Sequence, residues 1–250
     1  MGAKTALLAF TTGDLRPALR EAVDADPAEA LALVRGFHPD YDVTPIGDGV
    51  LGEDVYPPDD TSYATVLVGA ELLCDRRLVG DRPSQLPARL LQAGAGRRII
   101  MHGMHSVSDW LCFAVWENGS LVRSLSLSPD GGIVENIGEP YDFERPYWAG
   151  ERPAGATFTG DPYPLPFHPL ELGEDALRAL FGFILEGLRD PSDVDPYEVP
   201  LRGFRVADPT GREQAEREAT MERLLRQMGP PRRFRMKPDG TFEEIRDAEA

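Results

Sequence analysis

The sequence predicts an α+β fold, in which helices pack on a mainly antiparallel sheet of about six strands and a charged helical tail follows. Three observations support this prediction. Several short segments are strand-like, and a strong hairpin signal, Asn118-Gly119, joins two of them. Other segments repeat apolar residues at helical spacing. The composition also changes near residue 207, which indicates a boundary.

The N-terminal part is predicted to contain one strand and two helices. Residues 4–11 form a nearly continuous apolar run, which is typical of a buried strand. Asp14 follows this run and is a good helix cap, because its carboxylate accepts hydrogen bonds from the free amides of a first turn. Apolar residues then recur twice at helical spacing, so we expect helices within 14–37.

Two further strands and a short helix are expected before residue 97. Residues 41–46 alternate in polarity, and residues 61–68 are rich in Thr, Tyr and Val, which favour strands. Residues 86–93 have a helical pattern that ends at Gly94, a residue that commonly stops helices.

The middle of the chain is the most strand-like part. Residues 98–102, 110–116 and 121–128 are predicted strands. The segment 110–116 is apolar on both faces, so we place it in the middle of the sheet with cover on both sides. The segment 121–128 alternates in polarity, and we expect Arg123 to lie away from the face that its leucines form.

An irregular segment, residues 138–172, separates this region from the best helix pattern, residues 173–187. The segment is rich in aromatic residues, which are common anchors of interfaces. We therefore expect it to pack on the domain and to present Tyr147, Trp148 and Phe167 to a partner. Residues 199–206 are expected to add an edge strand.

The last part of the chain differs in composition from the rest. Residues 212–227 carry charges of both signs and few apolar residues, which predicts a marginal helix. We therefore expect a single α+β domain over residues 1–206 and an appendage of one helix and a flexible tail over 207–250.

Composition narrows the class of partner. The formal net charge is −16, which argues against nucleic acid or an anionic membrane as the main partner. No stretch approaches the roughly 20 apolar residues of a membrane-spanning helix, and no secretory leader is predicted. The two cysteines, Cys74 and Cys112, lie in apolar runs typical of a core. We expect a cytoplasmic protein.

Polar side chains gather in residues 102–109, which include His102, His105 and Asp109. These residue types are used in metal sites and in Ser-His-Asp relays. In an extended strand His102 and His105 point to opposite faces, whereas a turn at Gly103 would allow them to converge. The alternative interpretation is a polar turn between two strands. No metal-ligand set is predicted, and the sequence indicates no particular cofactor.

His168 lies between prolines, which fix the backbone around its side chain. Such a run is more often a rigid docking segment before a helix than a functional site. Should His168 reach the turn after His102, a catalytic role would gain support. Two functions therefore stay open: a non-enzymatic protein-binding or regulatory module that uses residues 138–172, and a hydrolase or metal-dependent enzyme built on His102, His105, Asp109 and possibly His168.

Three motifs occur in order along the chain, over residues 102–110, 125–151 and 164–183. They include Leu125-Ser126-Leu127-Ser128-Pro129-Asp130-Gly131-Gly132 and Pro164-Leu165-Pro166-Phe167-His168-Pro169-Leu170. Together they resemble an actinobacterial family of uncharacterised proteins known only as a domain of unknown function. The resemblance covers residues 3–206 and leaves the tail out. It implies no activity, cofactor or catalytic residue.

Overall fold

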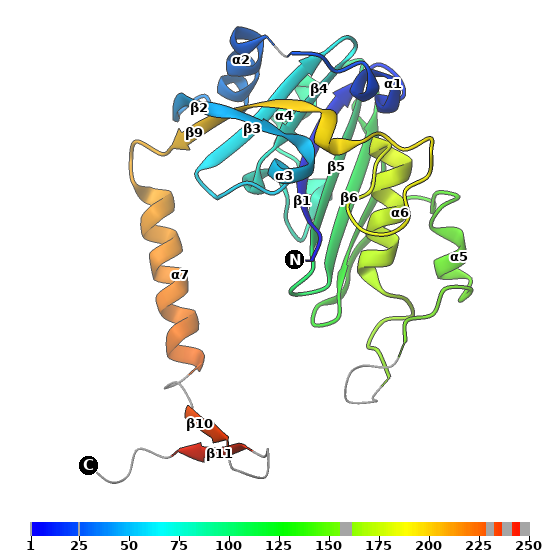
Figure 1. Cartoon of the computed structure of the whole chain (residues 1–250), viewed down its shortest axis with the longest axis vertical. Coiled ribbons are helices and arrows are strands. Elements are labelled where there is room, and N and C mark those ends of the chain that lie inside the picture. Colours follow the sequence, from blue (N-terminus) through cyan, green and yellow to red (C-terminus); the bar gives the residue numbers. More distant parts are fainter. Residues whose placement is uncertain (1, 25, 156–161, 229–232, 237–241, 246–250) are drawn as a thin grey trace. The chain divides into compact units, whose positions relative to one another are not determined.

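The computed structural model describes residues 2–24, 26–155, 162–228, 233–236 and 242–245 (Figure 1). The chain divides into two compact units, residues 1–207 and residues 208–250. The strands and helices that carry the candidate site residues lie in the first unit.

The first unit is built on one antiparallel sheet, and nine strands of it lie in the described residues, in the order β2-β9-β3-β4-β1-β5-β6-β7-β8. The strands are β1 (Lys4–Thr11), β2 (Asp42–Val50), β3 (Thr61–Leu67), β4 (Ala70–Cys74), β5 (Arg98–His105), β6 (Trp110–Glu117), β7 (Ser120–Ser128), β8 (Gly132–Ile137) and β9 (Pro200–Ala207). The sheet is larger than the predicted six strands.

These strands differ from the prediction in two features. The predicted strand 61–68 is followed, after Val68 and Gly69, by a short strand β4, which the sequence analysis did not assign. The predicted edge strand at residues 199–206 is β9, which pairs with both β2 and β3 and is therefore internal. The edges are β2 and β8.

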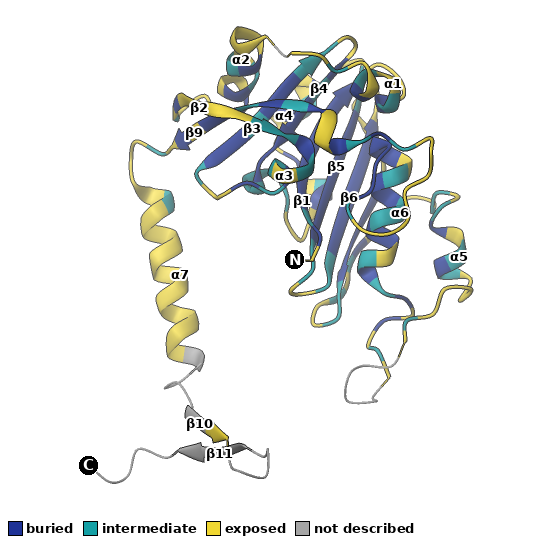
Figure 2. Ribbon diagram, viewed as in Figure 1, coloured by how far each residue is buried: buried dark blue, intermediate teal, exposed yellow. Residues whose placement is uncertain are grey.

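Alternate side chains of the central strand β1 enter two different cores, because successive residues of a strand face opposite sides. Leu7 and Ala9 belong to one core, and Leu8 and Phe10 belong to the other. Cover on both faces explains the continuous apolar run of β1 and of β6, which is buried from Leu111 to Trp116 (Figure 2). The burial of β6 agrees with the prediction that the segment 110–116 is covered on both faces.

The helices cover the two faces of the sheet. They are α1 (Leu15–Arg20), α2 (Pro27–Phe37), α3 (Leu51–Asp54), α4 (Ala88–Ala93), α5 (Arg145–Trp148) and α6 (Pro169–Phe181), with 3-10 turns at Arg76–Leu78, Pro83–Gln85 and Pro196–Glu198. Helix α6 packs on β5 and β6 on the Leu7 side of the sheet, whereas α2 and α4 contribute to the core on the Leu8 side (Figure 1).

Helix α6 begins and ends earlier than the predicted helix 173–187. His168 caps its first turn, because the backbone amide of Leu170 donates to the Nδ1 atom of His168 over 3.3 Å. The helix ends at Phe181 because Gly182 adopts a left-handed conformation, with φ of 86°. Its amide donates back to the carbonyls of Leu177 and Arg178, which closes the helix end.

Arg123 was expected away from the leucine face of β7 but is fully buried, as is its partner Glu144. The guanidinium Nε donates to Glu144 Oε1 over 2.9 Å, and Nη1 donates to Asn136 and to the carbonyls of Ile137 and Gly138. Strand alternation places Arg123 on the face of Leu125 and Leu127, and Glu144 compensates the buried charge. This ion pair anchors the start of segment 138–172 to the sheet.

The second unit contains helix α7 (Arg212–Met228) and a hairpin of β10 (Arg233–Met236) and β11 (Phe242–Ile245). The helix agrees with the predicted segment 212–227, but the hairpin was not predicted. Met221, Leu224 and Leu225 are exposed on α7. Among the described residues, none of the helices has the length and apolar character required to cross a membrane.

Candidate functional site

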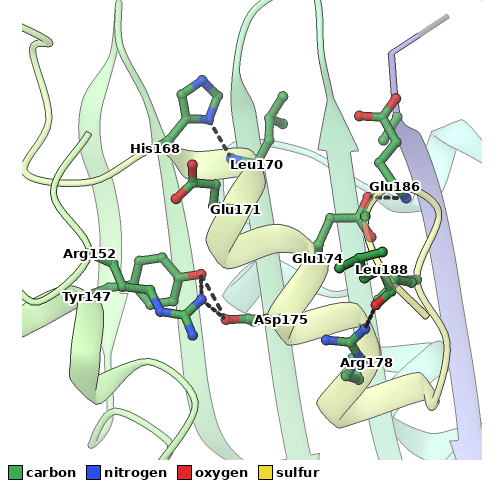
Figure 3. A pocket seen from close by; sticks show the side chains of 13 residues that line it. Tyr147, Arg152, His168, Leu170, Glu171, Glu174, Asp175, Arg178, Glu186 and Leu188 are labelled. Atoms are coloured by element: carbon green, nitrogen blue, oxygen red, sulfur yellow. Dashed lines mark hydrogen bonds and ion pairs between the residues drawn. The ribbon is translucent and has the colours of Figure 1, made fainter. Parts of the chain in front are cut away.

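A groove of about 470 Å³ runs along the outer face of α6 (Figure 3). One wall comes from the aromatic segment 138–172 and another from the residues that follow α6. The lining side chains that matter for its chemistry are Tyr147, Arg152, His168, Glu171, Glu174, Asp175, Arg178, Glu186 and Leu188.

The sequence of α6 explains why charged side chains gather in the groove. Glu171, Glu174, Asp175 and Arg178 are spaced by three and four residues, which places them on one face of a helix. The opposite face, which includes Leu172, Ala176, Leu177 and Leu180, is buried against the sheet. Burial of the apolar face therefore turns the charged face outward into the groove.

Both arginines of the groove already have partners. Arg152 donates to Asp175 over 3.1 Å, and the hydroxyl of Tyr147 donates to the same carboxylate over 2.8 Å. Burial and the nearby Asp175 raise the pKa of the Tyr147 phenol, so it stays protonated as a donor. Arg178 pairs with Asp193 over 3.1 Å and donates to the carbonyl of Leu188.

Three other carboxylates of the groove do not pair with these arginines, although the charge of Arg178 lowers the pKa of Glu174. Glu171, Glu174 and Glu186 form no ion pair with a cation anywhere in the described residues. Glu174 accepts hydrogen bonds from the amides of Leu185 and Glu186 over 2.9 and 3.2 Å. Burial nevertheless raises the pKa of Glu174 to about 7. The groove therefore has excess negative charge, and this charge increases as Glu174 loses its proton near neutral pH.

His102, a predicted catalytic or metal-binding residue, is completely buried, and both of its nitrogens are occupied. The carbonyl of Gly173 can only accept, so Nε2 donates to it over 3.0 Å, and Nδ1 then accepts from the hydroxyl of Thr5 over 2.7 Å. Burial lowers the pKa of His102 to about 4. This neutral imidazole links β1 and β5 to α6 and has no nitrogen left for a substrate or an ion.

The other predicted site residues are brought together only in part. Asp109 approaches His168, with 3.6 Å between Oδ2 and Nε2, and it also accepts from the hydroxyl of Tyr163 over 3.0 Å. Nδ1 of His168 caps α6, whereas Nε2 faces Asp109 from beyond hydrogen-bond distance. His105 lies on the face of β5 opposite to that of His102, and its ring packs against the ring of Tyr56 in an edge arrangement.

The aromatic residues predicted to contact a partner pack mainly against one another. Tyr147 and Phe167 are each 1% exposed, and Trp148 is half-buried. The ring of Phe167 lies 5.4 Å from that of Tyr147 and 5.0 Å from that of Trp148. These rings give the segment a fixed shape, and of the three residues only Tyr147 lines the groove.

The groove carboxylates were not among the site residues predicted from the sequence. Their spacing of three and four residues was visible, but this pattern also describes any solvated helix face. Within the described ranges, no group of three or more His, Cys, Asp or Glu side chains is arranged to hold a metal ion.

A family model described as "Family of unknown function (DUF6928)" matches residues 5–204. This range contains every lining residue of the groove except Ala3, and it ends before the second unit begins. Neither the curated proteins nor the solved structures gave a significant match.

Proposed function

Because the chain belongs to this family of unknown function, we propose its role from the geometry of the groove: a non-enzymatic module that binds a basic segment of a protein partner. One observation carries the proposal. Glu171, Glu174 and Glu186 line a single groove, and none of them forms an ion pair in the described part of the chain. Arginine or lysine side chains of a partner are the groups that would form ion pairs with these carboxylates.

The surroundings of the carboxylates add an apolar requirement. Leu188 is 93% exposed at the groove, and Leu170 is half-buried beside it. An exposed leucine next to unpaired carboxylates suits a segment that places an apolar side chain beside a basic one. The net charge of −16 favours the approach of such a segment from a distance.

The aromatic segment 138–172 takes part in this function as a wall of fixed shape. Tyr147 and Arg152 hold Asp175 in place, so Asp175 is unavailable to a partner and the three other carboxylates remain. A preformed wall reduces the ordering cost of binding. We place the module in the cytoplasm, because its two cysteines are free and buried, as is usual in a reducing compartment.

The alternative function, a hydrolase or metal-dependent enzyme, has less support. His102 uses both nitrogens within the fold, and Nδ1 of His168 caps α6. Nε2 of His168, 3.6 Å from Asp109, is thus the one nitrogen of these two rings without a hydrogen bond in the described residues. A general base needs a nitrogen that can reach a substrate proton.

The test is fluorescence anisotropy with a labelled peptide of alternating Arg and Leu, and with its counterpart in which Glu replaces Arg. We expect saturable binding of the basic peptide and no binding of the acidic one. In the double variant Glu171→Gln/Glu186→Gln we expect about tenfold weaker binding, since two ion pairs of up to ~1 kcal/mol each are lost.

A matched control separates the groove from the overall charge. Glu53→Gln/Glu139→Gln changes the net charge equally at two exposed carboxylates that do not line the groove. We expect this variant to bind as the wild type does. An equal loss in both double variants, or no binding of the basic peptide at all, would refute the proposal.

A further inference from the structure

A second cavity of about 490 Å³ lies at the end of the sheet where β1 begins. Four separate parts of the chain meet there: the residues after α3, the 3-10 turn after β4, the turn between β5 and β6, and the turn between β7 and β8. They contribute Tyr56, Arg76, Val79, Gly80, Asp81, His105, Ser108, Trp110, Ser128 and Asp130. This volume suits a small molecule, and loops on a rigid sheet are common places for binding sites.

The inner part of this pocket is aromatic and apolar. Tyr56, Val79, His105 and Trp110 are all half-buried. The rings of Tyr56 and His105 lie 5.7 Å apart in an edge arrangement. Trp110 directly faces His105 in the pairing of β5 with β6, so the two side chains share one side of the sheet. A flat ring is the shape that such walls accommodate best.

Two cations adjoin this aromatic lining. The guanidinium of Arg76 lies 4.1 Å from the ring centre of Tyr56, and the ammonium of Lys4 lies 5.8 Å from it. Arg76 has one carboxylate partner, Asp59, over 3.0 Å, and its buried Nε has no acceptor among the described residues. Lys4 forms no ion pair within the same residues. Burial, Lys4 and Arg76 together lower the pKa of His105.

The carboxylates of the pocket occupy its rim. Asp81 and Asp130 are both exposed, so solvent and salt screen their charges more than those of the half-buried groups inside. They nevertheless repel a ligand that carries several negative charges. The two cations beside Tyr56 and the exposed carboxylates therefore favour a ligand with a single negative charge, placed near Tyr56.

We propose that this pocket binds a small planar aromatic compound with one negative charge, of the class of the aromatic carboxylates. The ring packs among Tyr56, Val79 and Trp110, and the carboxylate lies toward Arg76 and Lys4. This site is separate from the groove along α6, and the two share no lining residue.

The test is isothermal titration calorimetry of the full chain with benzoate and indole-3-acetate as probes. Benzamide, which has the same ring without the charge, is the neutral comparison, and inorganic phosphate is the non-aromatic one. We expect saturable binding of the aromatic carboxylates, at least tenfold weaker binding of benzamide and no binding of phosphate. Equal affinity for benzoate and benzamide, or no saturable binding of either carboxylate, would overturn the proposal.

Variants locate the binding within the molecule. Arg76→Gln is expected to weaken benzoate binding at least tenfold. Arg189→Gln is the matched control, because Arg189 also combines a tyrosine ring (Tyr197, 5.7 Å) with an aspartate partner (Asp195, 2.8 Å) outside the pocket. Its affinity should equal that of the wild type, and an equal loss in both variants would contradict the site.

A variant with the opposite expected effect guards against misfolding as an explanation. Asp130→Asn removes a negative charge from the rim and is expected to strengthen benzoate binding by a few fold. A disrupted fold cannot produce stronger binding. Unchanged or weaker binding in Asp130→Asn would show that the charge arrangement proposed here does not govern the site.

Discussion

The buried ion pair between Arg123 and Glu144 gives the sharpest prediction about what holds segment 138–172 in place. Both side chains are completely buried, and Glu144 also accepts from the amide of Tyr141 and from the indole of Trp148. In Glu144→Gln the guanidinium loses its countercharge but stays buried. Removing one partner of such a pair typically destabilises a protein by about 3–5 kcal/mol.

The size of the effect on thermal unfolding follows from the size of the domain. For a domain of roughly 150–250 residues, each 1 kcal/mol lowers Tm by about 2–4 °C. We therefore expect Glu144→Gln to lower Tm by roughly 6–20 °C, measured by differential scanning calorimetry. Asp142→Asn is the control. Asp142 lies only two residues before Glu144, but its ion pair with Arg145 is exposed. Its Tm should stay within about 2 °C of the wild type.

A second variant tests the explanation and not only the loss. Arg123→Met/Glu144→Met removes both charges together and should be more stable than Glu144→Gln, because no unpaired charge stays buried. A Tm of Glu144→Gln within 2 °C of the wild type would refute the reasoning. So would a double variant that is less stable than the single one, since packing rather than charge would then hold the segment.

Three further predictions concern the half-buried Glu174, the buried His102 and the second unit. The pKa of Glu174 is about 7 in the fold and 4.5 ordinarily, so its protonated form stabilises the fold at low pH and this contribution is lost as the pH rises toward 7. The Tm of Glu174→Gln relative to that of the wild type should therefore increase between pH 4.5 and about 8. A Tm difference that stays constant over this range would contradict the prediction. The pKa of His102 is about 4 instead of 6.5, so its neutral ring stabilises the fold above pH 6.5, and this contribution of about 3 kcal/mol is lost as the pH falls toward 4. In chemical denaturation, the free energy of unfolding of His102→Gln should therefore decrease less between pH 6.5 and 4 than that of the wild type. Removal of residues 208–250 should leave the Tm of the first unit within about 2 °C, and a large decrease would show that the tail contributes to its core.

Local patterns predicted the elements that depend on local chemistry. The apolar run 4–11 became β1, Asp14 caps α1, and the Asn118-Gly119 turn joins β6 to β7 with Asn118 at a φ of 52°. Each of these features is decided within a few residues, by burial, by one hydrogen bond or by one turn conformation. The resemblance to a family of unknown function was confirmed as well, over residues 5–204.

The features that the sequence analysis missed depend on contacts between distant residues. Strand β9 lies inside the sheet because β2 pairs with it across 150 to 165 positions. Nothing in residues 199–206 alone distinguishes an internal strand from an edge. Arg123 is buried only because Glu144 reaches it from the following segment. The three unpaired groove carboxylates became evident only when the partners of Arg152 and Arg178 were known.

The turn between β5 and β6 links the two candidate sites, because its side chains serve both. His105, Ser108 and Trp110 line the aromatic pocket, whereas Asp109 holds His168 at the groove. Asp109→Ala should therefore weaken binding of the basic peptide a few fold, since the release of a half-exposed contact costs ~0.2–1 kcal/mol. Benzoate affinity should stay unchanged, because Asp109 does not line the pocket. A loss at both sites would mean that Asp109, at a φ of 46°, sets the shape of the whole turn, and the two sites would then be coupled through it.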